Sequence, residues 1–324
     1  MNKKTILVVG GAGYIGSHVN KMLNRAGYNT IILDNLSRGN AKAIMQGTFV
    51  EGDMADESLL DRIFNQYPIE AVMHFAAFTD VGESMVEPLK YYRNNVANTL
   101  CLLDAMRRHQ VRTFIFSSTA AIFGVPQQDS INEDHDCNPI NPYGESKLTL
   151  EKILHDLNRA NILRSCCLRY FNAAGGDPEG EIKYYQRKES NLIPKILQSL
   201  LKDDGVVTIF GTDYPTIDGT CIRDYIHIED LGQAHILAME QLLKGASSNC
   251  YNLGNGKGFS VREVITAAEK VTGKQIRVVE GPRRPGDPAI LVSNAYKAEK
   301  ELGWNPKYSS LESMIDHAWK AMKG

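Results

Sequence analysis

Ile6-Leu7-Val8-Val9-Gly10-Gly11-Ala12-Gly13-Tyr14-Ile15-Gly16 opens the chain and decides its fold. The four apolar residues predict a short buried strand that runs directly into a glycine-rich turn. The glycines fit both Gly-x-Gly-x-x-Gly (residues 11, 13 and 16) and Gly-x-x-Gly-x-x-Gly (residues 10, 13 and 16). Such a turn lets backbone N–H groups approach a pyrophosphate, and a helix that begins near Tyr14 aims its positive N-terminal end at the same anion. The stretch therefore predicts a dinucleotide-binding turn.

Two carboxylates further along the chain support this interpretation. Asp34 ends the predicted strand Thr30–Leu33 and lies 18 residues after Gly16. A carboxylate at this position accepts hydrogen bonds from the adenosine ribose hydroxyls and repels a 2′-phosphate, which favours NAD over NADP. Arg38 lies close enough in sequence to bind such a phosphate instead. Asp53, after the next strand, is placed to accept a hydrogen bond from the adenine amino group.

Short apolar strands alternate with helical segments through the first half of the chain, and this order is typical of parallel βαβ units. The predicted strands are Ile6–Val9, Thr30–Leu33, Thr48–Val50, Ala71–Phe75, Thr113–Phe116 and Ser165–Leu168, and the predicted helices cover about 14–26, 56–66, 83–108 and 143–160. The pattern predicts an α/β fold with a doubly wound parallel Rossmann sheet over residues 1–175. A smaller, loop-rich α/β lobe is expected over 176–324, with residues about 223–245 returning to the first lobe.

Composition excludes several classes of function. The 324 residues are 43% hydrophobic and 23% charged with a net charge of −2, so no basic surface for nucleic acid is expected. No run reaches the roughly 18–20 apolar residues of a membrane helix, and the apolar stretch near the N-terminus is too short for a signal peptide. The six cysteines and eight histidines lack metal-ligand spacing. We therefore expect a cytoplasmic protein with free thiols and without a metal site.

Tyr143 and Lys147 are the predicted catalytic pair. Asn141 is a plausible cap and Pro142 suits the first helical position, so the two residues lie one turn apart on a helix. A free tyrosine titrates near pH 10, and lowering its pKa to about 6–7 requires about 4–5.5 kcal/mol. A neighbouring ammonium and a positive nicotinamide are expected to supply this energy. Tyr-x-x-x-Lys is common by chance, and only its position after the glycine turn makes it informative.

Hydroxyl groups end the strand that precedes this helix. Ser117, Ser118 and Thr119 follow Thr113–Phe116, and open α/β sheets bind ligands at the carboxyl ends of their strands. Thr119 is the best candidate for a hydrogen bond to the reacting oxygen and for relaying its proton to Tyr143. Ser117 and Ser118 either share this role or only cap the strand end.

Nine motifs resemble those of the UDP-glucose 4-epimerase family, which belongs to the extended short-chain dehydrogenase/reductases, and together they extend over essentially the whole chain. The motifs are Gly-Gly-Ala-Gly-Tyr-Ile-Gly-Ser-His (10–18), Asp-Asn-Leu-Ser (34–37), His-Phe-Ala-Ala (74–77), Val-Gly-Glu-Ser (81–84), Asn-Pro-Tyr-Gly-Glu-Ser-Lys (141–147), Arg-Tyr-Phe-Asn-Ala-Ala-Gly (169–175), Asp-Tyr-Pro-Thr-Ile-Asp-Gly-Thr (213–220), Arg-Asp-Tyr-Ile-His (223–227) and Pro-Arg-Arg-Pro-Gly-Asp (282–287). The motifs at 10–18 and 141–147 identify only the superfamily. The motifs at 213–220 and 223–227 are more specific to the epimerase family.

The resemblance implies an NAD site and a nucleotide-sugar site. The NAD site would contain Gly10, Gly13, Tyr14, Ile15, Gly16, Asp34, Asn35, Leu36, Ser37, Arg38, Gly39, Asp53, Met54, Phe75, Ala76, Ala77, Phe78, Thr79, Asn95, Ser117, Thr119, Tyr143, Lys147, Tyr170 and Phe171. The nucleotide-sugar would contact Thr119, Tyr143, Asn172, Asn191, Leu192, Thr208, Phe210, Arg223, Arg284, Asp287 and Leu291. Independent chemistry agrees, because a phenylalanine face stacks on uracil, arginines bind a diphosphate and a carboxylate accepts from a ribose.

The chain departs from the family pattern at two positions. Thr79 stands where many relatives carry a lysine near the nicotinamide ribose, so one cofactor contact is in doubt. Leu291 falls where relatives carry either a tyrosine or a smaller residue at the sugar pocket. Because leucine is intermediate in size, it stays open whether UDP-N-acetylhexosamines fit as well as UDP-galactose and UDP-glucose.

The resemblance implies reversible oxidation at sugar C4 through a 4-keto intermediate, with UDP-galactose and UDP-glucose as partners. A 4,6-dehydratase would carry an acidic residue directly after Thr119, where this chain has Ala120-Ala121-Ile122-Phe123-Gly124. A net reductase would exchange its cofactor, often NADP, and a non-catalytic NAD sensor would lack the Tyr–Lys pair. A homodimer through segments 83–108 and 143–160 is also implied; the alternative is that the monomer alone buries their apolar residues.

Overall fold

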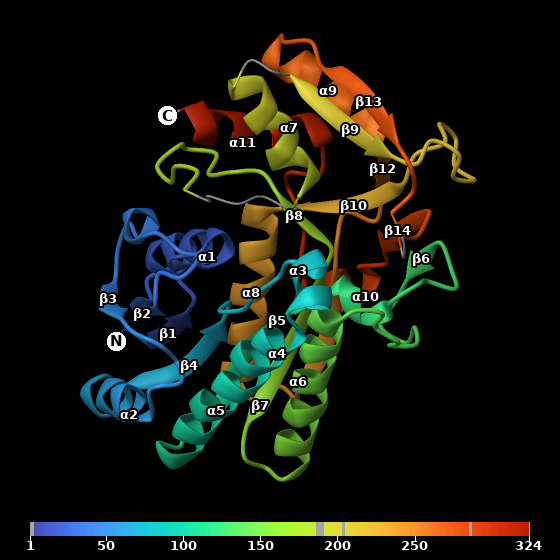
Figure 1. Cartoon of the computed structure of the whole chain (residues 1–324). Coiled ribbons are helices and arrows are strands. Elements are labelled where there is room, and N and C mark those ends of the chain that lie inside the picture. Colours follow the sequence, from blue (N-terminus) through green and yellow to red (C-terminus); the bar gives the residue numbers. More distant parts are fainter. Residues whose placement is uncertain (1–2, 186–190, 203–204, 285–286, 324) are drawn as a thin grey trace.

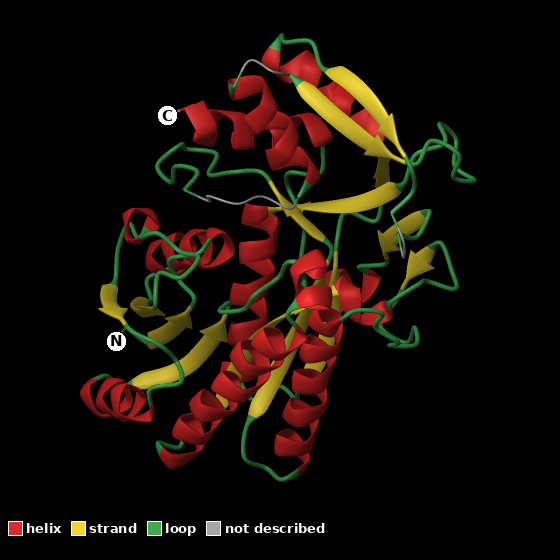
Figure 2. Ribbon diagram, viewed as in Figure 1, coloured by secondary structure: helices red, strands yellow, loops and turns green. Residues whose placement is uncertain are grey.

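The computed structural model describes residues 3–185, 191–202, 205–284 and 287–323 and has two lobes (Figure 1). The lower lobe in this view contains a large sheet with helices on both of its faces, and the upper lobe contains shorter strands and further helices (Figure 2). Long segments connect the lobes more than once, so the chain crosses between them rather than folding one lobe after the other.

The first lobe is built on a seven-stranded sheet with the order β11-β7-β5-β4-β1-β2-β3. All neighbouring strands run parallel. The strands are β1 (Thr5–Val9), β2 (Asn29–Asp34), β3 (Thr48–Glu51), β4 (Ile69–His74), β5 (Thr113–Thr119), β7 (Arg164–Tyr170) and β11 (Asn249–Leu253). The strand order reverses between β1 and β4, which is where open parallel sheets leave a ligand crevice. The predicted doubly wound fold is confirmed.

Helices cover both faces because each strand is apolar on both sides. One face carries α1 (Tyr14–Arg25) and α8 (Ile228–Leu243), whose buried side chains pack with Ile6 and Val8. The other carries α2 (Glu57–Gln66), α5 (Asn98–Arg108) and α6 (Pro142–Arg159), which pack with Leu7 and Val9. Alternate residues of β1 thus enter different cores.

The second lobe combines two small sheets with helices. The first sheet contains β12 (Gly258–Ser260), β10 (Ile222–His227), β14 (Ile290–Ser293), β6 (Ser130–Ile131) and β8 (Asn172–Ala174), and the second pairs β9 (Val206–Phe210) with β13 (Arg277–Gly281). Helices α7 (Leu192–Leu201), α9 (Val261–Thr272) and α11 (Leu311–Lys323) form a third core with these strands, while α10 (Tyr296–Leu302) packs in the core of the first lobe.

Strand β10 leads directly into α8, which lies against the large sheet, and β11 then becomes the edge strand of that sheet. Residues 222–253 therefore carry the chain back to the first lobe. The division of the chain at residue 175 stays a prediction.

Two elements differ from those expected from the sequence. The predicted helix 83–108 is divided into α3 (Val81–Val86), α4 (Pro88–Tyr91), a π-helical turn (Tyr92–Ala97) and α5. Pro88 explains the first break, because a proline disfavours helical dihedrals in the preceding residue, and Glu87 has φ −120° and ψ 56°. Strand β11 was not expected, since Asn249 and Asn252 interrupt its apolar pattern.

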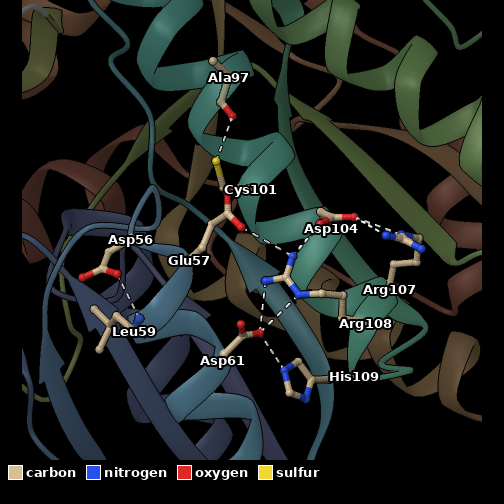
Figure 3. A network of polar contacts seen from close by, with 10 residues as sticks. All are labelled: Asp56, Glu57, Leu59, Asp61, Ala97, Cys101, Asp104, Arg107, Arg108 and His109. Atoms are coloured by element: carbon tan, nitrogen blue, oxygen red, sulfur yellow. Dashed lines mark hydrogen bonds and ion pairs between the residues drawn. The ribbon is translucent and has the colours of Figure 1, made fainter.

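A network of exposed ion pairs joins α5 to α2 (Figure 3). Arg108 lies at its centre, with its guanidinium 3.0 Å from Asp61 and also paired with Asp104 and Glu57. His109 places Nε2 2.8 Å from the same Asp61 oxygen. Exposed pairs of this kind contribute at most about 1 kcal/mol each because water screens them. The packing of apolar side chains beneath them must therefore hold the helices.

We expect Phe114→Ala to lower the free energy of unfolding by about 3–5 kcal/mol, since it removes a fully buried ring that stacks beside Phe116 and His74. Urea denaturation measures the change. Arg108→Ala is the comparison and is expected to cost less than about 1 kcal/mol. Equal losses in the two variants would contradict the view that burial, rather than the surface network, stabilises this face.

Candidate active site

A cavity of about 1000 Å³ lies along the carboxyl ends of the parallel strands. This volume suits a large ligand such as a dinucleotide. Many of the predicted residues line it: Gly10, Gly13, Tyr14, Ile15, Gly16, Asp34, Asn35, Leu36, Ser37, Arg38, Gly39, Asp53, Met54, Phe75, Ala76, Ala77, Thr79, Thr119, Tyr143, Lys147, Tyr170, Phe171, Asn172, Asn191 and Leu291. The loop after β1, the ends of β2 to β5, and α6 thus contribute to one continuous wall.

The glycine turn is too closely packed for side chains at Gly10 and Gly16. Gly10 has φ +80°, and a Cβ there would lie 2.5 Å from the backbone nitrogen of Ala76 at the end of β4. A Cβ on Gly16 would collide with the carbonyl oxygen of Gly10. Gly13 is the N-cap of α1, and because it has no side chain to cap the helix, the first N–H groups stay available for an anion. The turn therefore fits a pyrophosphate.

Asp34 and Asp53 stand beside this turn. The Asp34 carboxylate accepts hydrogen bonds from the backbone nitrogens of Ala12 (3.0 Å) and Leu36 (2.8 Å), so it also ties the glycine turn to the loop after β2. Burial raises the pKa of Asp34, and these two hydrogen bonds act against the rise. The Asp53 carboxylate accepts from Asn35 Nδ2 at 2.7 Å. Both carboxylates keep acceptor capacity for ribose or adenine groups.

Arg38, the alternative phosphate-binding residue, already has partners. Its guanidinium lies 3.1 Å from the Glu83 carboxylate and 5.4 Å from the centre of the Phe78 ring. A 2′-phosphate would have to compete with Glu83 for this charge and would face Asp34 as well. The geometry therefore supports NAD rather than NADP.

Helix α6 presents the Tyr143–Lys147 pair to the cavity. Asn141 caps the helix by accepting from the backbone nitrogen of Gly144 at 2.9 Å, and Pro142 occupies the first turn. Lys147 is 2% exposed, and its ammonium donates to the Ser117 carbonyl at 2.7 Å and lies 4.7 Å from the Phe116 ring centre. Burial lowers the pKa of Lys147 to about 7. The lysine is thus held in place by its contacts, and its pKa lies close to neutral pH.

Tyr143 is buried beside Thr119 and Tyr170. Burial raises the pKa of the Tyr143 phenol, while its hydrogen bond with Thr119 acts in the opposite direction. The phenol alone is therefore a poor base at neutral pH. It needs a neighbouring cation to favour the phenolate, and Lys147, one helical turn away, is placed to be that cation.

The other two hydroxyls at the end of β5 have different partners. Ser117 Oγ lies 3.3 Å from His235 Nε2, and Ser117 enters the site through its carbonyl, which accepts from Lys147. Ser118 Oγ donates to the Glu151 carboxylate at 2.5 Å. Among the three, Thr119 is the one whose residue lines the cavity.

Asn95 lies behind the cavity wall rather than in it. Its amide oxygen accepts from the backbone nitrogen of Phe78 at 2.9 Å, and its amide nitrogen donates to the Phe78 carbonyl and to Ser146 Oγ. Of the described residues at this place, Asn94 and Phe78 line the cavity. Asn95 thus supports the wall through Phe78. Phe78 was among the predicted residues of the NAD site, whereas Asn94 was not predicted.

Four of the predicted nucleotide-sugar residues share the cavity with Tyr143: Thr119, Asn172, Asn191 and Leu291. Asn172 is fixed on β8, where Nδ2 donates to the Asp224 carbonyl at 2.7 Å. Leu291 is the register partner of Arg223 on β10, so the arginine lies one strand away from the cavity wall. Tyr185, which also lines the cavity, carried no recognisable sequence signal.

The remaining predicted residues continue from this wall across the second lobe. Phe210 and Thr208 lie on the exposed face of β9, and the Arg284 guanidinium sits 3.9 Å above the centre of the Phe210 ring. Arg223 lies 3.4 Å from the Asp287 carboxylate. Leu192 begins α7 directly after Asn191. The lobe thus brings aromatic, cationic and acidic groups together, as a nucleoside diphosphate requires.

Comparison with known proteins agrees with this geometry. Residues 6–254 match the model of the NAD dependent epimerase/dehydratase family. UDP-glucose 4-epimerase of Halalkalibacterium halodurans is 52% identical over 314 residues, covering 97% of this chain and 94% of that protein. UDP-glucose 4-epimerase of Lacticaseibacillus casei is 46% identical over 316 residues, covering 97% and 96%.

Solved structures resemble the chain over nearly its whole length. The UDP-glucose 4-epimerase from Brucella ovis in complex with NAD has a TM-score of 0.95 and 45% identity, covering 98% of this chain and 97% of that one. The enzyme from Bifidobacterium longum in complex with NAD⁺ and UDP has a TM-score of 0.92 and 37% identity, covering 98% of each chain.

We expect Gly16→Ala to weaken binding of the predicted NAD by roughly tenfold to a hundredfold, because relieving the collision with Gly10 costs about 1–3 kcal/mol. Isothermal titration of the cofactor-free protein measures the affinity. Gly82→Ala in α3 is the control, since a Cβ there would lie 3.4 Å from Asp80 Oδ1, an ordinary van der Waals contact. Unchanged affinity in Gly16→Ala would show that the turn does not hold the pyrophosphate.

Proposed function

Because the chain belongs to the NAD dependent epimerase/dehydratase family, we infer that it is an enzyme that interconverts UDP-galactose and UDP-glucose. The observation that carries this conclusion is the Tyr143–Lys147 pair in the cavity that also contains the glycine turn. When bound, NAD supplies reversible hydride transfer at sugar C4, a chemistry that no side chain provides. The reaction passes through a 4-keto sugar and has no net redox change.

Tyr143 is the acid and base of this reaction. Its phenolate takes the proton of the C4 hydroxyl as the sugar is oxidised and returns it when the opposite face of C4 is reduced. Lys147 stabilises the phenolate by its charge, and Thr119 holds the reacting oxygen by a hydrogen bond. The burial that raises the pKa of Tyr143 also strengthens the attraction of Lys147 for the phenolate, since water screens it less.

The second lobe holds the UDP portion of the substrate. Phe210 stacks on uracil, Arg223 and Arg284 bind the diphosphate, and Asp287 accepts from the ribose. Binding energy placed on UDP leaves the hexose free to turn, so that either face of C4 can approach the nicotinamide. The 4-keto sugar rotates about its link to the diphosphate between the two half-reactions.

A 4,6-dehydratase is the nearest alternative, and the sequence after Thr119 argues against it. Ala120-Ala121-Ile122-Phe123 forms a short 3₁₀ helix without a carboxylate, so this segment lacks the acid that elimination of water would need. Residues Ala120 and Ala121 line the cavity next to Thr119.

The active form is a homodimer that works in the cytoplasm. Met85, Val86 and Leu89 on α3 and α4 are 60%, 77% and 75% exposed, and Leu100 on α5 adds a further exposed apolar residue. An exposed apolar row of this kind on neighbouring helices favours association with a second copy. In the described part of the chain, no helix combines the length and apolar character needed to cross a membrane.

Tyr143→Phe is expected to reduce conversion of UDP-galactose by about 10²–10⁴-fold while leaving NAD binding unchanged. The assay follows formation of UDP-glucose without added NAD, because the cofactor stays bound through turnover. Tyr296→Phe, on an exposed tyrosine of α10, is the control and should keep full activity. Full activity in Tyr143→Phe would refute the assignment of the base.

The double variant V86E/L89E is expected to be monomeric, because two charges would be buried without partners in the proposed interface. Light scattering after size-exclusion chromatography gives the mass, which should fall from twice the chain mass to the chain mass of 36.0 kDa. Ile217→Glu, on a loop residue that is 96% exposed in the second lobe, should stay dimeric. A dimeric V86E/L89E protein would place the interface elsewhere.

A further inference from the structure

A buried carboxylate lies one helical turn beyond the catalytic lysine. Tyr143, Lys147 and Glu151 follow one another at intervals of four residues, so all three lie on the face of α6 that meets the sheet. Glu151 is 7% exposed. An ionised carboxylate at such a depth is costly unless other groups pair with it. The proposed reaction gives it no role.

Glu151 is fully engaged by two neighbouring strands. From β7, Arg169 donates through Nη2 to Oε2 at 2.6 Å and through Nε to both carboxylate oxygens at 3.1 and 3.2 Å. From β5, Ser118 Oγ donates to Oε1 at 2.5 Å. Arg169 is fixed in turn by the Glu133 carbonyl at 3.2 Å and lies over the Phe123 ring. The pair is therefore rigid and largely shielded from water.

The charge of Glu151 acts on the ammonium of Lys147. Burial lowers the pKa of Lys147 to about 7, and the Glu151 carboxylate acts in the opposite direction. The same carboxylate also raises the pKa of Arg169. The other titratable side chains packed around Lys147 and Glu151 are Tyr143 on α6, His74 on β4, Cys167 and Tyr170 on β7, Cys250 on β11, and Cys137 and Glu133 in the segment before α6.

We propose that Glu151, held in place by Arg169, is a positioning residue that keeps Lys147 charged and thereby keeps the Tyr143 phenolate stabilised. This inference rests on the proposed function and adds two residues that touch neither the sugar nor the cofactor. A nearby negative charge favours the ammonium form of Lys147, and a nearby positive charge disfavours it. Removing either member of the pair alone must therefore move the titration of Lys147 and Tyr143, and the two removals must move it in opposite directions.

The test compares Glu151→Gln, Arg169→Met and the double variant E151Q/R169M. Loss of the carboxylate should shift the alkaline limb of the kcat/KM profile, where Lys147 loses its proton, down by roughly one pH unit. Loss of the guanidinium should shift the limb up by a similar amount. The double variant loses two opposing charges, so its downward shift should be smaller than that of Glu151→Gln, and Arg169→Lys, which keeps the charge, should stay close to the wild-type profile.

Asp156→Asn is the matched control, because it removes one negative charge from an exposed position of the same helix and should leave the profile unchanged. A second measurement follows the ultraviolet absorption of tyrosinate in each variant, corrected with its Tyr143→Phe counterpart. The Tyr143 titration should move opposite to the kinetic limb, up in Glu151→Gln and down in Arg169→Met, because a Lys147 that loses its proton more easily stabilises the phenolate less. This readout does not depend on turnover.

Shifts of the same sign in both single variants, or no shift in Glu151→Gln, would overturn the proposal. Should Arg169→Met not fold, the downward shift in Glu151→Gln against its absence in Asp156→Asn carries the test, because glutamine keeps the shape of the buried side chain. Wild-type protein that fails to convert UDP-galactose would refute the proposed function instead, and the tyrosinate titration would still decide on the pair.

Discussion

The site depends on a lysine ammonium that is held out of water. Burial lowers the pKa of Lys147 to about 7, which favours loss of its proton. A neutral amine would not stabilise the Tyr143 phenolate. The Ser117 carbonyl orients the ammonium at 2.7 Å, and the ring of Phe116 closes one side of it. Both groups come from β5, so the end of one strand fixes the lysine that we propose to activate Tyr143 on the next helix.

The large sheet places this strand end opposite the glycine turn. Since β4 separates β1 from β5 and all three run parallel, their carboxyl ends open into one crevice. Gly10 can approach Ala76 at the end of β4 only because it has no Cβ and adopts a positive φ. Cofactor turn and catalytic helix are therefore positioned by the same strands, and a change in their packing would move both together.

Much of this arrangement could be predicted from sequence because it is local. Strand β1, the glycine turn and α1 are consecutive, and Tyr143 and Lys147 share one helix, so periodicity and spacing are sufficient to identify them. The break of segment 83–108 at Pro88 was also a local signal, but it was outweighed by the apolar pattern on both sides. Strand β11 was missed because its neighbour β7 lies about 80 residues earlier, and only the pairing makes Asn252 a strand residue.

Pairings between distant segments were out of reach for a different reason. Spacing predicts that Glu151 lies one turn after Lys147, but the sequence does not say that Arg169 on β7 meets it. The same applies to Asn95: the family resemblance implied a place in the cofactor site, whereas its buried amide forms hydrogen bonds with Phe78 and Ser146. Which of two adjacent asparagines faces a cavity is decided by the rotation of a helix, here within the π-helical turn Tyr92–Ala97.

The two lobes meet different physical demands. The first lobe must hold charged groups at fixed distances, and it does so with buried strands whose side chains pack into two dense cores. The second lobe must hold a nucleotide while a hexose turns, and it offers the exposed Phe210 on β9 and the half-buried Arg223 on β10 rather than an enclosed pocket around the sugar. Strands β8 and β10 pair at the junction of the lobes and keep Asn172 beside the cavity without closing it. A rigid catalytic site and a loosely held sugar can therefore exist in the same molecule.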